Sequence, residues 1–201
     1  AHAAYLDFFQ PGSTGERYMA YQERRAIGGT GMIILTAMHV HESSGLMNHF
    51  NYEERDMARK FQQLSTRLHR HGTTAISQLF HYGAQSISST RADFHPLWGF
   101  SGTHSSEGET AHEMTDAEIE SVIDGFCRTA QIVVENGMDG VELHGTHGYL
   151  IQQSFTPAFN KRTDKWGEPL FFVKELAKRV RATIGRDKVM GFRISSDDFI
   201  D

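Results

Sequence analysis

The sequence has little of what marks a secreted, membrane or nucleic-acid-binding protein. It contains one cysteine, Cys127, which cannot form an internal disulfide, so a reducing compartment is the default. No apolar stretch approaches the length of a membrane span, and no signal-like segment opens the chain. A net charge of -5 and a pI of about 6.2 leave no basic surface for nucleic acid or for a membrane. We expect a cytoplasmic protein without these partners, and the oligomeric state stays open.

Two motifs that would assign a function are absent. No His-Glu-x-x-His pattern occurs, and no cysteine or carboxylate near His144 and His147 completes a ligand set, so we expect no metal. No Gly-x-Gly-x-x-Gly turn follows a first strand, because the glycines at 28, 29 and 31 precede a strand. This disfavours a doubly wound dinucleotide-binding fold. With 201 residues, 39% of them hydrophobic, the chain is long enough for one domain with a sizeable core.

Helical and strand patterns alternate along the chain four times. Continuous apolar runs, rather than alternating ones, indicate strands buried on both faces, as in a parallel sheet covered by helices. This order predicts an α/β fold, and we favour a partial (β/α)8 TIM barrel. The segment from 81 to 112 is too long for an ordinary connector and is expected to be a substrate loop. The expected helices cover residues 16–27, 53–70, 115–135 and 170–184, and the expected strands cover 31–37, 74–79, 139–144 and 189–194.

The strand ends carry polar side chains where a barrel builds its site, at the carboxyl end of the sheet. Gln78, His144 and Arg193 each finish an apolar run, and Thr36 and Ala37 finish another. An amide offers a donor and an acceptor to a ring edge, and a guanidinium stabilises negative charge on it, which are the needs of a flavin. Ordinary alternatives remain open at this stage. Gln78 could cap a loop, and Arg193 could pair with a carboxylate such as that of Asp197.

Three groups able to donate or exchange protons follow the strand near residue 143. They are His144, His147 and Tyr149, in a turn broken by two glycines. Each could instead have a purely structural role. A histidine at a strand end is more often a hydrogen-bonded structural residue than a catalyst, and a tyrosine can cap a core. The cluster is nevertheless the first place to look for an active-site wall.

The segment around this cluster resembles the signature of Old Yellow Enzyme-like NADH:flavin oxidoreductases. The resemblance rests on residues 144–153, on Pro157 and on residues 160–167. Further matches at residues 23–31, 78–81 and 191–195 extend it over essentially the whole chain. The family includes 2,4-dienoyl-CoA reductases and trimethylamine dehydrogenase.

This resemblance implies an FMN enzyme that NADH or NADPH reduces. Gln78 would bind the pyrimidine edge of FMN, Arg193 would hold its N1/O2 side, and Ala37 would lie against the isoalloxazine. His144 and His147 would bind the oxygen of an electron-poor small-molecule substrate, and Tyr149 would supply the proton. The implied reaction is reduction of the C=C bond of an enone or a dienoyl thioester. Amine oxidation or demethylation on the same scaffold, and a non-catalytic barrel fragment, are the alternatives.

The chain departs from the family pattern in three places. The family usually has Gly-Arg after the His-x pair, whereas here His81 and Tyr82 are followed by Gly83 and Ala84, and Glu168 to Phe172 replaces a Gly-rich helix start. The resemblance also implies that the first strand precedes residue 1 and that the strands holding the FMN phosphate follow residue 201. We therefore expect residues 1–201 to be an FMN-binding barrel domain that is incomplete at both ends, and inactive as a segment. An iron-sulfur cluster and FAD, as in larger relatives, would lie outside this chain.

Overall fold

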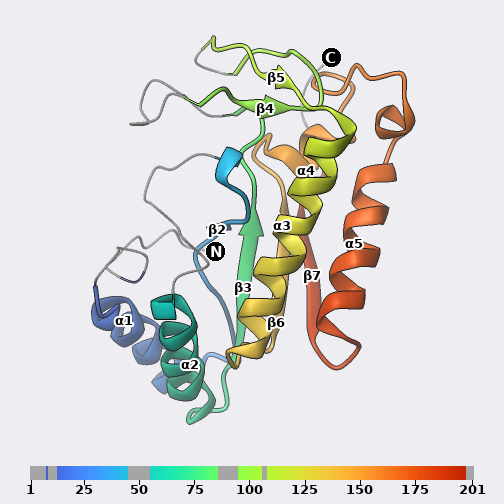
Figure 1. Ribbon diagram of the computed structural model, residues 1–201. Helices are drawn as coiled ribbons and strands as arrows, with labels where there is room; N and C mark the ends of the chain where they lie inside the picture. Colours follow the sequence, from blue (N-terminus) through green and yellow to red (C-terminus); the bar gives the residue numbers. More distant parts are fainter. Residues whose placement is uncertain (1–7, 9–12, 45–54, 86–94, 106–107, 198–201) are drawn as a thin grey trace.

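The computed structural model describes residues 8, 13–44, 55–85, 95–105 and 108–197 (Figure 1). Helices and strands alternate along most of this length, as the hydrophobic patterns indicate. The elements are α1 (Glu16–Ile27), β1 (Met32–Ile34), β2 (Met38–His39), η2 (Glu42–Ser44), α2 (Arg55–His69), β3 (Thr74–Phe80), β4 (Trp98–Gly99), β5 (His112–Glu113), α3 (Asp116–Glu135), β6 (Gly140–Gly145), α4 (Leu150–Gln153), η4 (Lys165–Gly167), α5 (Phe171–Ile184) and β7 (Val189–Ile194).

The main sheet is parallel throughout. Its strands run in the order β1, β3, β6, β7, and β2 pairs with the carboxyl half of β3 beyond β1. Each strand therefore neighbours the strand that precedes it in the main series, with a helix in between. This order is that of consecutive β/α units, and the sheet is a curled half-barrel that confirms the expected partial TIM barrel.

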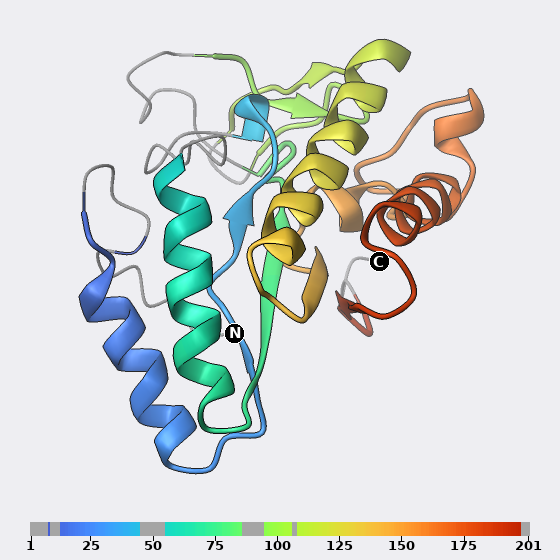
Figure 2. The ribbon, with the colours of Figure 1, turned by 60° about the horizontal axis from the view of Figure 1, so that its bottom comes forward.

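The helices α1, α2, α3 and α5 lie together on one side of the sheet (Figure 2). They form with the strands a continuous apolar core, which explains their helical spacing of apolar residues. The predicted faces of α2 and α3 are buried, with Phe61, Leu64, Ile123 and Phe126 fully enclosed. The capping box expected at Thr115 is present, since Thr115 accepts from the Glu118 N–H while the Glu118 side chain accepts from the Thr115 N–H.

The first expected strand, 31–37, is wrong as a single element. Only β1 falls within it, and β2 follows beyond its expected end; the two pair with different halves of β3. The cause lies in helix α1, because the N–H of Thr36 donates to the phenol oxygen of the buried Tyr18 at 3.0 Å rather than to β3. Tyr18 in turn donates to the Thr36 hydroxyl at 3.3 Å. The predicted end of this strand therefore serves to anchor α1.

The expected loop 81–112 is also wrong in part. Within its described residues it contains β4, which pairs in parallel with β5. This small sheet lies beyond the carboxyl ends of β3 and β6, as does α4 (Figure 1). Arg162 holds it there by donating to the carbonyl oxygens of Phe100, at 3.3 Å, and of Met114, at 2.7 Å. The segment is thus partly a fixed cover over the end of the barrel where we expect the site.

None of the helices in the described ranges has both the length and the apolar character that crossing a bilayer needs. The one cysteine lies half-buried in α3, and burial raises the pKa of its thiol.

Candidate functional site

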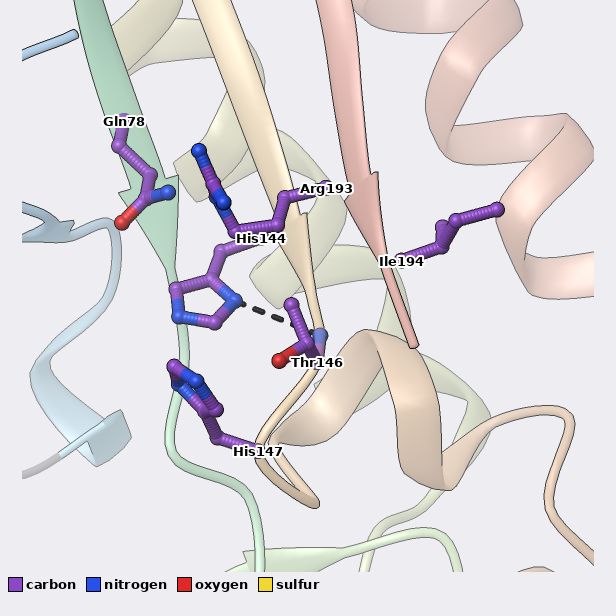
Figure 3. A pocket seen from close by; sticks show the side chains of 6 residues that line it. All are labelled: Gln78, His144, Thr146, His147, Arg193 and Ile194. Carbon is purple, nitrogen blue, oxygen red and sulfur yellow. Dashed lines mark hydrogen bonds between the residues drawn. The ribbon is translucent and has the colours of Figure 1, made fainter. Parts of the chain in front are cut away.

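A cavity of about 240 Å³ opens at the carboxyl ends of β3, β6 and β7. Four of the residues predicted from the sequence line it, and they come from three strands and one turn. Figure 3 shows the guanidinium of Arg193 reaching toward Gln78, with the rings of His144 and His147 beside them, whereas the Ile194 side chain points away. The lining residues are Gln78, His144, Thr146, His147, Arg193 and Ile194.

The register of the parallel strands brings these residues together. Gln78 of β3 is the pairing partner of Glu142 in β6, and His144 of β6 is the partner of Arg193 in β7. Side chains two residues apart on a strand share a face, so Glu142 and His144 lie on the same face of β6. Val141 and Leu143, which point to the opposite face, are instead part of the apolar core.

The turn after β6 is held by two glutamines of α4. Gln152 accepts from the Gly148 N–H at 2.8 Å, and Gln153 donates to the Gly148 carbonyl at 2.6 Å. Directly before Gly148, the backbone of His147 takes a left-handed conformation with φ of 62°, which is uncommon for a residue other than glycine. The two glutamines thus fix a strained turn that presents the exposed His147 to the cavity.

His144 is kept neutral by its surroundings. Only 4% of the residue is exposed, and this burial, followed by the charges of His147 and Arg193, lowers the pKa of His144 to about 4. Its Nδ1 accepts from the backbone N–H of Thr146 at 3.4 Å, so the single proton of the neutral ring lies on Nε2. His144 can therefore donate a hydrogen bond from Nε2 without carrying charge.

Tyr149 is packed against both histidines but does not line the cavity. Its ring centroid lies 5.1 Å from that of His144 and 5.7 Å from that of His147. Phe80 and Tyr82 complete an aromatic group around it, with centroids 5.5 and 5.0 Å away. Tyr149 therefore contacts both histidines through its ring, and its role as proton donor stays a prediction.

Ala37 is not among the lining residues. It immediately precedes Met38, which pairs with Leu79, so it lies at the level of Gln78 on the neighbouring strand. It is half-buried there. Ala37 therefore lies beside Gln78, a residue that lines the cavity, at the same end of the sheet.

The residue that sequence reasoning missed is Glu142. Its Oε1 accepts from Gln78 Nε2 at 2.5 Å and from Arg193 Nε at 3.0 Å. The suggested partner of Arg193, Asp197, is thus wrong, and so is a loop-capping role for Gln78. A signal for Glu142 was present, because a carboxylate inside an apolar strand, two residues before His144, is unusual unless it is paired. Among the described residues, no three His, Cys, Asp or Glu side chains gather as a metal-binding group.

The model of the NADH:flavin oxidoreductase / NADH oxidase family matches residues 3–201 of the chain. The chain belongs to this family. Among its relatives in the family, an N,N-dimethylglycine/sarcosine dehydrogenase of Chromohalobacter salexigens is 34% identical over 196 residues, which are 94% of this chain and 28% of the relative. An NADH oxidase of Thermoanaerobacter brockii is 31% identical over 198 residues, 96% of this chain and 30% of the relative.

A solved structure shares the fold of this family member. It is a 2-naphthoyl-CoA reductase in complex with 2-naphthoyl-CoA, with a TM-score of 0.79 and 25% identity over 95% of this chain and 32% of the reductase. The chain thus spans less than a third of the length of each of these three proteins. The family that the sequence resembles is the one to which the chain belongs.

Proposed function

We propose that this chain is part of an FMN-dependent oxidoreductase that uses NADH or NADPH to reduce an activated C=C bond. Residues 1–201 would supply the side chains that bind the pyrimidine edge of FMN and the wall that binds the substrate. The substrate would be an enone or a dienoyl thioester. The observation that carries this proposal is the convergence of Gln78, His144, His147 and Arg193 on one cavity at the carboxyl ends of three parallel strands.

The residues of the cavity fit the pyrimidine edge of a flavin. Within the described part of the chain, Gln78 Oε1 and the two terminal nitrogens of Arg193 make no hydrogen bond, although Gln78 Nε2 and Arg193 Nε both donate to Glu142. Gln78 would accept from the N3–H of the edge, and Arg193 would donate to its N1/O2 side. Ala37, with its small side chain at the same level, would leave room for the flat face of the ring. When bound, FMN supplies a hydride carrier between NAD(P)H and the β-carbon of the substrate.

Two histidines would bind the carbonyl oxygen of the substrate. His144 offers the Nε2–H of a neutral ring, and His147 lies beside it with a ring centroid 4.9 Å away. As a C–H bond forms at the β-carbon, the electron pair of the C=C bond moves toward the carbonyl oxygen. Two donors already in place stabilise that charge, and removal of one such donor costs about 10²- to 10³-fold in rate.

Tyr149 would complete the reaction by giving its proton to the α-carbon. It is half-buried beside both histidines, so a substrate whose oxygen they hold would lie within its reach. A phenol can donate the proton of its O–H group, which makes it a suitable general acid.

A second function on the same scaffold is oxidation of an amine, as the name of the dimethylglycine/sarcosine dehydrogenase suggests for that relative. The charges in the cavity favour the carbonyl substrate. Among the described residues that line it there is no carboxylate, and the nearby Glu142 is already paired with Arg193, whose positive charge would repel a substrate ammonium. The 2-naphthoyl-CoA bound to the structurally similar reductase is an acyl thioester, which supports a carbonyl substrate over an amine.

A visible absorption spectrum of the natural full-length protein tests the proposal. We expect a flavin spectrum that bleaches under anaerobic conditions on addition of NADH or NADPH, and that returns when an enone is added. A protein that is colourless and takes up no added FMN would refute the proposal, and the non-catalytic barrel would replace it. Bleaching that sarcosine causes in the absence of NADH and NADPH, with no response to any enone, would favour the amine reaction.

A further inference from the structure

Glu142 is a buried carboxylate on the inner face of the sheet, where the apolar pattern of β6 gives no reason for one. Only 8% of the residue is exposed. Removing a carboxylate from water is costly unless it is paired and hydrogen-bonded, so its partners account for its presence. It does not line the cavity itself but lies between two residues that do.

One oxygen of Glu142 receives both of its donors. Gln78 Nε2 lies 2.5 Å from Oε1, and Arg193 Nε lies 3.0 Å from the same atom. The donors come from the strands on either side of β6, and Gln78 is the direct pairing partner of Glu142. Hydrogen bonds to a carboxylate are stronger than those between neutral groups, so Glu142 ties the two side chains to a common point.

The consequence differs for the two partners. The amide of Gln78 is fixed with its nitrogen toward Glu142, which leaves the oxygen as the group it can offer to a ligand. The guanidinium of Arg193 is held by Nε alone, so its two terminal nitrogens stay available in the cavity. The carboxylate also places one negative charge next to the positive charge of Arg193.

We propose that Glu142 is a positioning residue for the cofactor, which orients the amide of Gln78 and offsets part of the charge of Arg193 at the flavin edge. This inference rests on the proposed function. The reduced flavin ring carries negative charge, so an Arg193 without its counter-charge would stabilise the reduced form more strongly. Glu142 therefore keeps the reduction potential of the bound FMN lower than Arg193 alone would set it.

The test compares Glu142→Gln and Glu142→Asp with the wild-type protein at its natural length. Glu142→Gln keeps the size of the side chain and an acceptor oxygen but loses the charge, so the potential of bound FMN, measured against a redox dye, should move in the positive direction. Glu142→Asp keeps the charge but is shorter and cannot reach both partners. It should retain a potential near that of wild type, while the dissociation constant for FMN, from quenching of flavin fluorescence, rises about 10- to 100-fold.

Glu175→Gln is the matched control, because Glu175 pairs with Arg179 and Lys178 on the outer helix α5, and it should change neither quantity. An unchanged potential in Glu142→Gln overturns the charge effect, and an unchanged affinity in Glu142→Asp overturns the orienting effect. Should Glu142→Gln fail to fold, as seen by circular dichroism, the FMN affinity of Glu142→Asp decides the matter. Wild-type protein that binds no FMN would refute the proposed function and this inference together, whereas wild-type binding with silent variants refutes the inference alone.

Discussion

The low pKa of His144 makes the stability of the protein depend on pH in a defined window. The folded protein takes up this proton with a pKa of about 4, against 6.5 for an unperturbed histidine. Between these values the unfolded chain binds more protons at this site than the folded chain, so the free energy of unfolding rises with pH there and falls on acidification. For a single site with these two values, the loss between pH 7.5 and pH 5 is about 2 kcal/mol.

Replacement of His144 by glutamine should remove this contribution. The glutamine oxygen can accept from the Thr146 N–H as Nδ1 does, and it does not titrate. Urea unfolding at pH 7.5, 6 and 5, followed by tryptophan fluorescence, should show a pH dependence in the variant that is flatter than in wild type by about 2 kcal/mol. His104→Gln, at an exposed histidine of the outer segment, should leave the wild-type dependence in place. Equal slopes for wild type and His144→Gln would refute the argument that burial keeps His144 neutral.

Two further predictions concern the register of the sheet and the proton donor. A Cβ at Gly140 would fall 2.0 Å from the backbone oxygen of Val189, so Gly140→Ala should lower the free energy of unfolding in urea by about 1–3 kcal/mol. Gly191→Ala, whose Cβ would meet nothing nearer than 4.0 Å, should cost little, and equal losses in both would contradict the steric reason. Tyr149→Phe should slow reoxidation by an enone about 10²- to 10⁴-fold in stopped flow, with reduction by NAD(P)H unchanged, and equal slowing of both half-reactions would exclude a proton-donor role.

The regular elements could be predicted because their signals are local. Helices α1, α3 and α5 and strands β3, β6 and β7 lie within a residue or two of their expected bounds, since apolar spacing, glycine stops and a capping box all act within a few residues. The polar strand ends could be predicted for a related reason. Parallel strands end at one edge of a sheet, so Gln78, His144 and Arg193 had to be near one another once the fold class was right.

The features that escaped prediction depend on contacts between distant residues. The interruption between β1 and β2 depends on Tyr18, 18 positions before Thr36, and the partner of Arg193 lies 51 positions away in Glu142. No periodicity encodes such pairs. The sheet of β4 and β5 is short, with two residues in each strand, so it carries no pattern that distinguishes it from a loop.

The register of β3, β6 and β7 links the fold to the chemistry. A slip of one residue would turn the side chains of β6 over, placing Leu143 in the cavity and His144 against the helices. Gly140 disfavours such a slip at the start of β6, because only a residue without a side chain allows the backbone of Val189 to approach so closely. Two residues further along β6, Glu142 joins the same three strands through hydrogen bonds to Gln78 and Arg193. The interactions that set the strand pairing are therefore also those that aim the polar groups at the cavity, and a loss of register should abolish binding before it unfolds the protein.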